Sequence, residues 1–148
     1  LIIDDEKAIC EVLSASLRDE EYKVEVAHDG DSGLQLMKSF RPSVVLLDIW
    51  MPGIDGIETA RRITAMRLKT QTHPVMITAY GREEVMQKAQ EVGLDGFLLK
   101  PVSPSLLFDA AMQAFGQAVP EEGRAGRKKQ KETKYKSTDD TDSEKILN

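Results

Sequence analysis

"VVLLDIWMPGIDG", residues 44–56, ends an apolar run in a carboxylate and follows it at once with a turn. A continuous apolar run is typical of a strand that is buried on both faces of a parallel sheet. Because a charge is costly inside such a strand, we expect Asp48 at its carboxyl end. Open α/β sheets bind ligands at the carboxyl ends of their strands, so Asp48 is a candidate site residue.

Short apolar runs alternate with amphipathic stretches along most of the chain. Five strands, each followed by a helix, predict an α/β fold: a doubly wound parallel sheet with right-handed crossovers and helices on both faces. Strands are expected at residues 1–3, 23–27, 44–47, 75–78 and 96–99. Apolar residues at helical spacing mark the helices: Ile9, Val12, Leu13 and Leu17 in the first; Leu34, Leu36 and Met37 in the second, about 31–39; Ile57, Ala60 and Ile63 in the third; Val85, Ala89 and Val92 in the fourth; and Leu107, Ala110, Ala111 and Ala114 in the last, about 103–118, which Ser103 can cap.

The composition is within the range of globular proteins. The 148 residues are 41% hydrophobic and 30% charged, and no apolar run is long enough to span a membrane. A single cysteine, Cys10, excludes an internal disulfide framework and lies in a helical pattern, so we expect it to have a packing role. These features favour a cytoplasmic protein, and the net charge of −5 does not suggest a nucleic-acid binder.

The composition changes near residue 118. Residues 118–148 have few apolar side chains and carry a basic block, 124–136, followed by an acidic one, 139–144. This predicts a domain at residues 1–117 and a charged linker or disordered tail at 118–148, with weak docking to a partner as the alternative. The chain does not begin with Met, and only three residues precede the first acids, so we expect a fragment of a longer polypeptide.

Polar side chains follow four of the predicted strands. Asp4, Asp5 and Glu6 follow the first, whereas Asp48, Thr78 and Lys100 end the third, fourth and fifth. Clustered carboxylates stay ionised most readily around a cation, and Mg²⁺ prefers oxygen ligands. One carboxylate could then attack phosphorus while the lysine and the hydroxyl hold phosphoryl oxygens. Each residue alone could be a helix cap, a turn residue or a surface residue, but the set predicts that Asp48 is phosphorylated.

The same residues resemble a known family, the response-regulator receiver domains of two-component phosphorelays. The resemblance covers about residues 1–117 and implies a flavodoxin-like (CheY-like) sheet of strand order 2-1-3-4-5. It is carried by "IIDDE" (2–6), "LLDIWMPGIDG" (46–56), "MITAYG" (76–81) and "DGFLLKP" (95–101).

The resemblance also implies roles for individual residues. Asp48 would accept a phosphoryl group from a phosphohistidine. Asp5 and Asp48 would bind Mg²⁺, or Mn²⁺, together with the backbone carbonyl of Trp50, and Asp4 would help through water. A receiver is at most capable of its own phosphorylation and dephosphorylation, although the parent protein could be a histidine kinase.

The switch that the resemblance implies lies beside the acceptor. Thr78 and Lys100 would contact the phosphoryl group, and Phe97 would turn as Thr78 moves inward, which would change the surface of the fourth helix, fifth strand and fifth helix. A plain core role is the alternative for Phe97. The Lys100–Pro101 bond is expected to be cis.

Two aromatic residues flank the acceptor in the sequence. Trp50 lies two residues after Asp48, and Tyr80 two residues after Thr78. We expect them to shield the acyl phosphate from water and to lengthen its lifetime. His28 and His73 do not lie in a kinase-like motif, which favours a phosphoryl receiver over a donor.

Three other functions fit the pattern less well. A haloacid-dehalogenase-like phosphatase wants a second acid where Trp50 stands, and a flavodoxin wants a neutral phosphate loop where this chain has three acids. A pseudo-receiver that acts only as an interaction module would not need the complete acceptor set.

The parent protein and its partners are also matters of expectation. The text "KPVSPSLLFDAAMQAFG" (100–116) resembles receivers of hybrid sensor histidine kinases, with the receiver arm of a response regulator as the alternative. The expected partners are a histidine kinase or a histidine phosphotransfer domain, and a second copy bound through the fourth helix, fifth strand and fifth helix. No direct contact with nucleic acid or membrane is expected.

Overall fold

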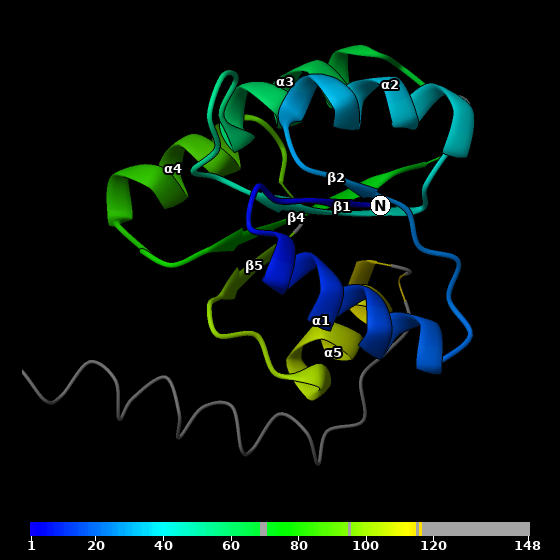
Figure 1. The fold of residues 1–148 in the computed structure, drawn as a ribbon. Coiled ribbons are helices and arrows are strands. Elements are labelled where there is room, and N and C mark those ends of the chain that lie inside the picture. The colour runs from blue at the N-terminus through cyan, green and yellow to red at the C-terminus, as the bar shows by residue number, and fades with distance from the viewer. Residues whose placement is uncertain (69–70, 95, 115, 117–148) are drawn as a thin grey trace, which may run out of the picture. The chain divides into compact units, whose positions relative to one another are not determined.

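The computed structural model describes residues 1–68, 71–94, 96–114 and 116, so the predicted linker at 118–148 lies outside the described residues. Five strands and five helices alternate along the described chain (Figure 1). In order they are β1 (Ile2–Ile3), α1 (Lys7–Asp19), β2 (Val26–Ala27), α2 (Gly30–Phe40), β3 (Val44–Asp48), α3 (Gly56–Ala65), β4 (His73–Thr78), α4 (Glu83–Glu91), β5 (Gly96–Leu99) and α5 (Pro104–Ala114).

The strands form one parallel sheet of order β2-β1-β3-β4-β5, which confirms the predicted fold class and strand order. β3 lies at the centre, with Leu47 opposite Ile3 of β1 and Asp48 opposite Ile77 of β4. Helices α2 and α3 cover one face of the sheet, and α1 and α5 cover the other (Figure 1). The last residues of all five strands therefore meet at one edge.

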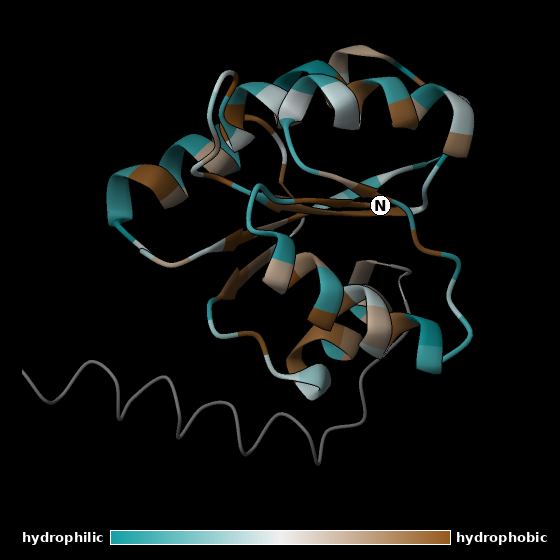
Figure 2. Cartoon of the chain, in the orientation of Figure 1, coloured by the Kyte–Doolittle hydropathy of each residue, from teal (hydrophilic) through white to brown (hydrophobic). Residues whose placement is uncertain are grey.

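Each face of the sheet has its own apolar core, because successive side chains of a strand point to opposite faces. Val45 and Leu47 belong to the core beneath α2 and α3, whereas Leu46 belongs to the core beneath α1 and α5. Figure 2 shows hydrophobic strands between helices whose outward surfaces are more hydrophilic. Burial on both faces explains why the sequence of β3 is continuously apolar up to Asp48.

Some element boundaries differ from the prediction. β2 is limited to Val26–Ala27, although the carbonyl of Glu25 still accepts a hydrogen bond from the Ile2 amide. Leu13 and Leu17 lie on the core face of the first helix as predicted, but Val12 is 63% exposed, so its assignment to that face is wrong. Ser14 is buried there instead, because its hydroxyl donates to the Glu11 carbonyl 3.1 Å away and so needs no water.

Side-chain caps mark the starts of α2 and α5. Asp29 caps α2 by accepting from the Ser32 amide, and Ser103 Oγ accepts from the Leu106 amide at the start of α5, as predicted. Among the described residues, no helix has both the length and the apolar character needed to cross a membrane.

Candidate functional site

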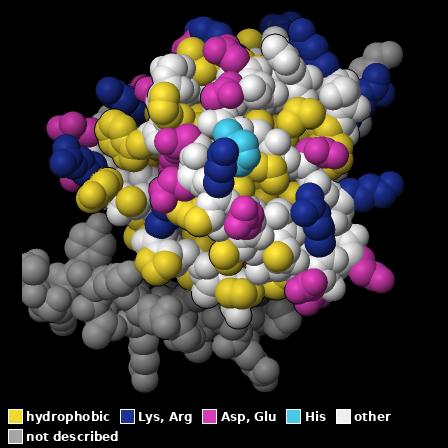
Figure 3. All heavy atoms as spheres, in the orientation of Figure 1, with side chains coloured by type: hydrophobic (Ala, Val, Ile, Leu, Met, Phe, Trp, Pro, Cys, Tyr) yellow, Lys and Arg dark blue, Asp and Glu magenta, His cyan; other side chains and the backbone are white. Residues whose placement is uncertain are grey.

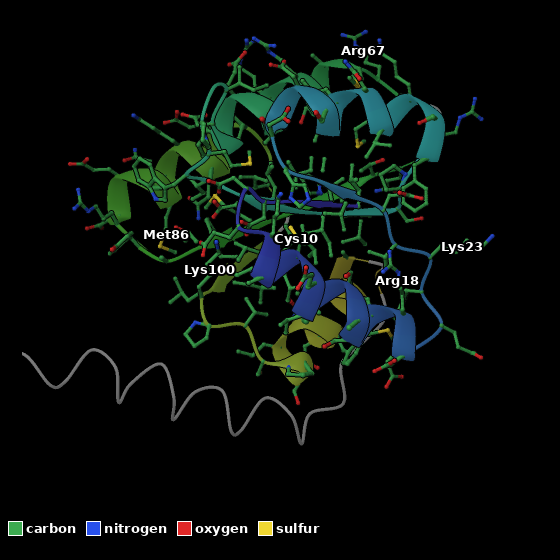
Figure 4. The ribbon with its side chains drawn as sticks, viewed as in Figure 1. Cys10, Arg18, Lys23, Arg67, Met86 and Lys100 are labelled. Carbon is green, nitrogen blue, oxygen red and sulfur yellow. The ribbon has the colours of Figure 1, made fainter. Side chains whose placement is uncertain are left out.

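Four strand ends bring polar side chains to the same edge of the sheet. Asp4 follows β1, Asp48 is the last residue of β3, Thr78 is the last residue of β4, and Lys100 follows β5. Figure 4 places Lys100 beside the end of β5, near the start of α1. The topology thus gathers residues that are far apart in the sequence, and the distances show which of them are in contact.

Three carboxylates form the floor of this site. One ligand oxygen each from Asp4, Asp5 and Asp48 lies within 4.8 Å of the others, and Asp4 and Asp48 are only 1% and 4% exposed. Asp4 Oδ2 is buried, and the Lys100 ammonium lies 3.0 Å from it. Three clustered carboxylates, two of them buried, suit a hard cation such as Mg²⁺.

Lys100 provides the positive charge of the site within the protein. Its Nζ lies 3.0 Å from Asp4 Oδ2, 3.1 Å from Glu6 Oε1 and 3.2 Å from Asp48 Oδ1. Burial by itself lowers the pKa of the ammonium, but Asp4, Asp48 and Glu6 together raise the pKa of Lys100 well above its usual value. Lys100 is therefore a permanent cation that Asp4, Glu6 and Asp48 share.

Asp48 is a weaker acid than an ordinary aspartate. Burial, and then the charge of Asp4, raise the pKa of Asp48 to about 6, although Lys100 opposes this shift. One lysine thus does not fully offset the cost of burying these carboxylates. A further cation bound beside these carboxylates would therefore stabilise their ionised form.

The position of Asp4 is fixed mainly by its backbone. Its carbonyl accepts a hydrogen bond from Cys10 Sγ at 3.2 Å and lies 3.2 Å from His28 Nδ1, while its Oδ1 accepts from the Glu6 amide at 2.9 Å. Glu6, not an aspartate, occupies the N-cap position of α1, and it makes no side-chain cap. Asp4 thus supports the turn before the helix and leaves Oδ2 directed at Lys100.

Cys10 is a packed residue of the core beneath α1 and α5. Its thiol is 2% exposed, and burial, with the nearby charge of Asp4, raises the pKa of Cys10 to about 11. A thiol in this state stays neutral and is a poor nucleophile. This agrees with the packing role expected from the sequence.

Thr78 is held by its own loop. Its hydroxyl donates to the Tyr80 carbonyl and accepts from the Tyr80 amide, both at 3.2 Å, and the residue is 1% exposed. Such a turn satisfies a buried hydroxyl locally. To reach a group on Asp48, Thr78 would have to give up these two bonds.

The aromatic residues named from the sequence occupy different environments. Phe97 pairs with Met76 across β4 and β5 and packs, half-buried, against the small cluster of Ile49, Met76 and Ala89. Trp50 and Tyr80 are 54% and 64% exposed. Both follow strands that end at the site, so they lie on its rim and not in the core.

A close backbone contact shapes the loop after Asp48. Gly56 donates its amide hydrogen to the Ile49 carbonyl at 2.8 Å, and a Cβ on Gly56 would collide with the backbone oxygen of Asp48. Only glycine fits where two main chains approach so closely. The final Gly of the opening stretch therefore fixes the acceptor loop.

One contact of this site was not predicted from the sequence. Glu6 was noted with Asp4 and Asp5, but its contact with Lys100 was not predicted, since 94 residues separate the two. The bond between Lys100 and Pro101 is cis, as expected. In the space-filling view, acidic and basic side chains are interspersed over this face (Figure 3).

A family model matches most of the chain. The model of the response regulator receiver domain matches residues 1–112. This range includes each of the four strand ends described above.

Solved structures give the same result. The chain is similar to the chemotaxis protein CheY4 of Vibrio cholerae, with 29% identity and a TM-score of 0.73, over 76% of this chain and 94% of that one. It is also similar to the signal receiver domain of the putative response regulator NarL of Mycobacterium tuberculosis, with 30% identity and a TM-score of 0.72, over 78% and 94%. A third neighbour is the signal receiver domain of a modulated diguanylate cyclase of Desulfovibrio desulfuricans G20, with 30% identity and a TM-score of 0.69, over 76% and 89%.

Proposed function

Since the chain belongs to the response regulator receiver domain family, we propose that Asp48 accepts a phosphoryl group from a phosphohistidine of a histidine kinase or histidine phosphotransfer domain. Receiver domains are phosphoacceptors of two-component signalling in general. The observation that supports Asp48 as the acceptor is its place at the end of the central strand, 3.2 Å from the Lys100 ammonium and beside two further carboxylates. A nucleophile, a cation and metal-binding oxygens are thus within reach of one phosphoryl group.

The proposed transfer needs no further catalytic group from this chain. A carboxylate oxygen of Asp48 attacks phosphorus, the bond between phosphorus and the donor imidazole nitrogen breaks, and its electron pair leaves with the imidazole. Lys100 and the hydroxyl of Thr78 then bind the phosphoryl oxygens, which carry the charge. Water would later attack phosphorus, which cleaves the acyl phosphate, releases inorganic phosphate and restores the Asp48 carboxylate.

The residues fit a divalent cation. Asp5 and Asp48 would hold Mg²⁺ or Mn²⁺ with the backbone carbonyl of Trp50, and Asp4 would assist through water. The ion, when bound, would neutralise the carboxylates that otherwise repel an incoming phosphoryl group. The clustered oxygens of Asp4, Asp5 and Asp48 and the raised pKa of Asp48 support this proposal.

Thr78 and Phe97 form the proposed switch. In the structure the Thr78 hydroxyl is bonded to the backbone of Tyr80, and Phe97 is half-buried on β5. Phosphorylation would draw the hydroxyl toward Asp48 and let Phe97 turn into the vacated space. The surface formed by α4, β5 and α5 would then change and could recruit a partner or a second copy.

Trp50 and Tyr80 are proposed to control the lifetime of the acyl phosphate. Both are large, exposed and at the rim of the site. Neither carries a carboxylate or amide that could orient a hydrolytic water molecule. Their bulk would therefore slow hydrolysis.

Intact mass spectrometry tests the acceptor directly. We expect one labile phosphoryl adduct after incubation with acetyl phosphate and Mg²⁺, and none with EDTA or with Asp48→Asn. Asp55→Asn is the matched control, because Asp55 lies in the same loop and asparagine can still cap α3. Absence of both the adduct and beryllofluoride binding by the wild type would contradict the proposal and favour a pseudo-receiver.

The parent is proposed to be a hybrid sensor histidine kinase in the cytoplasm, or with this domain on the cytoplasmic side of a membrane. The similarity of residues 100–116 to receivers of such kinases supports this. A response regulator with a separate effector is the alternative. A histidine-kinase ATP-binding region encoded upstream in the full gene would decide for the first, and an effector domain encoded downstream for the second.

A further inference from the structure

One acid at the site lies outside the carboxylate cluster. The oxygens that could bind a cation come from Asp4, Asp5 and Asp48, whereas Glu6 points to Lys100 alone. The side chain of Glu6 is 60% exposed and that of Lys100 is 12% exposed. Glu6 therefore reaches from solvent to a nearly buried ammonium.

Glu6 is one of three acids that contact the Lys100 ammonium. Glu6 Oε1 lies 3.1 Å from Lys100 Nζ with the geometry of a hydrogen bond, and Asp4 Oδ2 and Asp48 Oδ1 lie 3.0 Å and 3.2 Å from the same nitrogen. Glu6 thus shares the ammonium with two buried carboxylates and is the exposed one of the three. A hydrogen bond between charged groups is stronger than one between neutral groups.

The ammonium has only three hydrogens to donate. A phosphoryl group on Asp48 would bring further anionic oxygens to Lys100, so at least one present contact must weaken. The carboxylates of the cluster would be neutralised by a bound cation, which leaves Glu6 as the acid without another counter-charge. Because the Glu6 side chain is exposed, water can solvate its carboxylate when it releases the Lys100 ammonium.

From these contacts we propose that Glu6 is a positioning residue that holds Lys100 in the unphosphorylated protein and competes with the phosphoryl group for its ammonium. This inference rests on the proposed function of Asp48. Glu6 would then influence the affinity of the site for a phosphoryl group without binding the phosphoryl group or the metal itself.

Titration with beryllofluoride, a phosphoryl mimic, at saturating Mg²⁺ tests the proposal. Isothermal titration calorimetry gives the affinity without relying on any reporter residue. We expect Glu6→Gln to bind beryllofluoride about two- to fivefold more tightly than the wild type, the range that follows from the strength of exposed ion pairs. Glu11→Gln, the same charge change at an exposed residue of α1, should leave the affinity unchanged.

A double-variant cycle distinguishes competition from a general effect of charge. In a Lys100→Met background, Glu6→Gln should no longer tighten binding, because no ammonium remains to be released. No gain in Glu6→Gln, a weaker affinity, or an equal gain in Glu11→Gln or in the Lys100→Met background would overturn the proposal. A wild type that neither binds beryllofluoride nor forms the adduct would instead contradict the proposed function of Asp48.

Discussion

At the scale of the residue, the burial of Asp48 has a consequence for stability. Its pKa of about 6 in the folded protein lies above the ordinary 3.8, so the folded protein binds more protons than the unfolded chain between about pH 4 and pH 6. Stability must therefore fall as the pH rises through this window. Above pH 6 the full cost of the buried charge is present.

Asp48→Asn should remove this cost. In EDTA at pH 7.5 we expect the variant to raise the free energy of unfolding by about 1–2 kcal/mol, less than the full shift because water screens the site. The gain should vanish near pH 4, where the wild-type carboxyl is also neutral. Urea titrations at both pH values measure it, with the exposed Asp31→Asn as control. An equal gain at both pH values would contradict the assignment to ionisation.

The rim aromatics give a second prediction at this scale. Trp50→Asn combined with Tyr80→Ala should shorten the lifetime of the acyl phosphate several-fold, since both changes open the path for water. The Trp50→Phe and Tyr80→Phe pair keeps the bulk and should decay as the wild type does. Loss of the phosphoryl adduct with time, followed by intact mass, measures the rate. The shielding proposal is wrong if the two double variants decay alike.

At the scale of the element, α3 and the acceptor loop share a boundary. Asp55 Oδ1 accepts the amide hydrogen of Glu58 at 2.8 Å, and the next residue, Gly56, begins the helix and makes the close contact with the Asp48 backbone. The cap therefore stabilises both the helix and the loop that carries the acceptor.

Removing this cap should cost a moderate amount of stability. Asp55→Ala is expected to lower the free energy of unfolding by about 1 kcal/mol, within the 0.5–2 kcal/mol range of helix caps. Asp55→Asn keeps an oxygen in the same place and should lose much less. Urea unfolding followed by circular dichroism compares them, and equal losses in the two variants would show that the hydrogen bond is not responsible.

The elements also show what the sequence could and could not predict. The acceptor strand was evident because both faces of β3 are buried, which leaves a continuous apolar run before Asp48. The edge of the buried face of α1 was not evident, because hydropathy ranks Val12 above Ser14, whereas a local hydrogen bond lets the serine be buried. The two-residue length of β2 also escaped prediction, since an edge strand is paired on one side only.

At the scale of the whole molecule, the site is a property of the topology. Parallel strands bring Asp4, Asp48, Thr78 and Lys100 to one edge once their order is known, and that order, which the resemblance to receiver domains implied, is the one observed. The sequence could not predict which groups bond to which. The Glu6–Lys100 contact and the turn at Thr78 depend on side-chain rotamers and loop geometry.

Cation binding should stabilise the entire fold, because the carboxylate cluster exists only in the folded state. At about 100 times its dissociation constant, Mg²⁺ should add roughly 2.7 kcal/mol and raise the melting temperature by about 5–15 °C. Asp5→Asn should lose most of this shift, and Asp31→Asn should keep it. Thermal melts with Mg²⁺ and with EDTA make the comparison. A shift that survives in Asp5→Asn would place the cation elsewhere.

The separation of 94 positions between Glu6 and Lys100 also determines the order in which the site is synthesised. At roughly 5–20 residues per second, a ribosome makes the lysine about 5–20 seconds after the acids of the first loop. During that interval the ammonium that contacts Asp4, Glu6 and Asp48 in the folded protein does not yet exist. The nascent chain thus receives this counter-ion after all the acids of the site, and the closure of this edge of the sheet must follow the synthesis of β5.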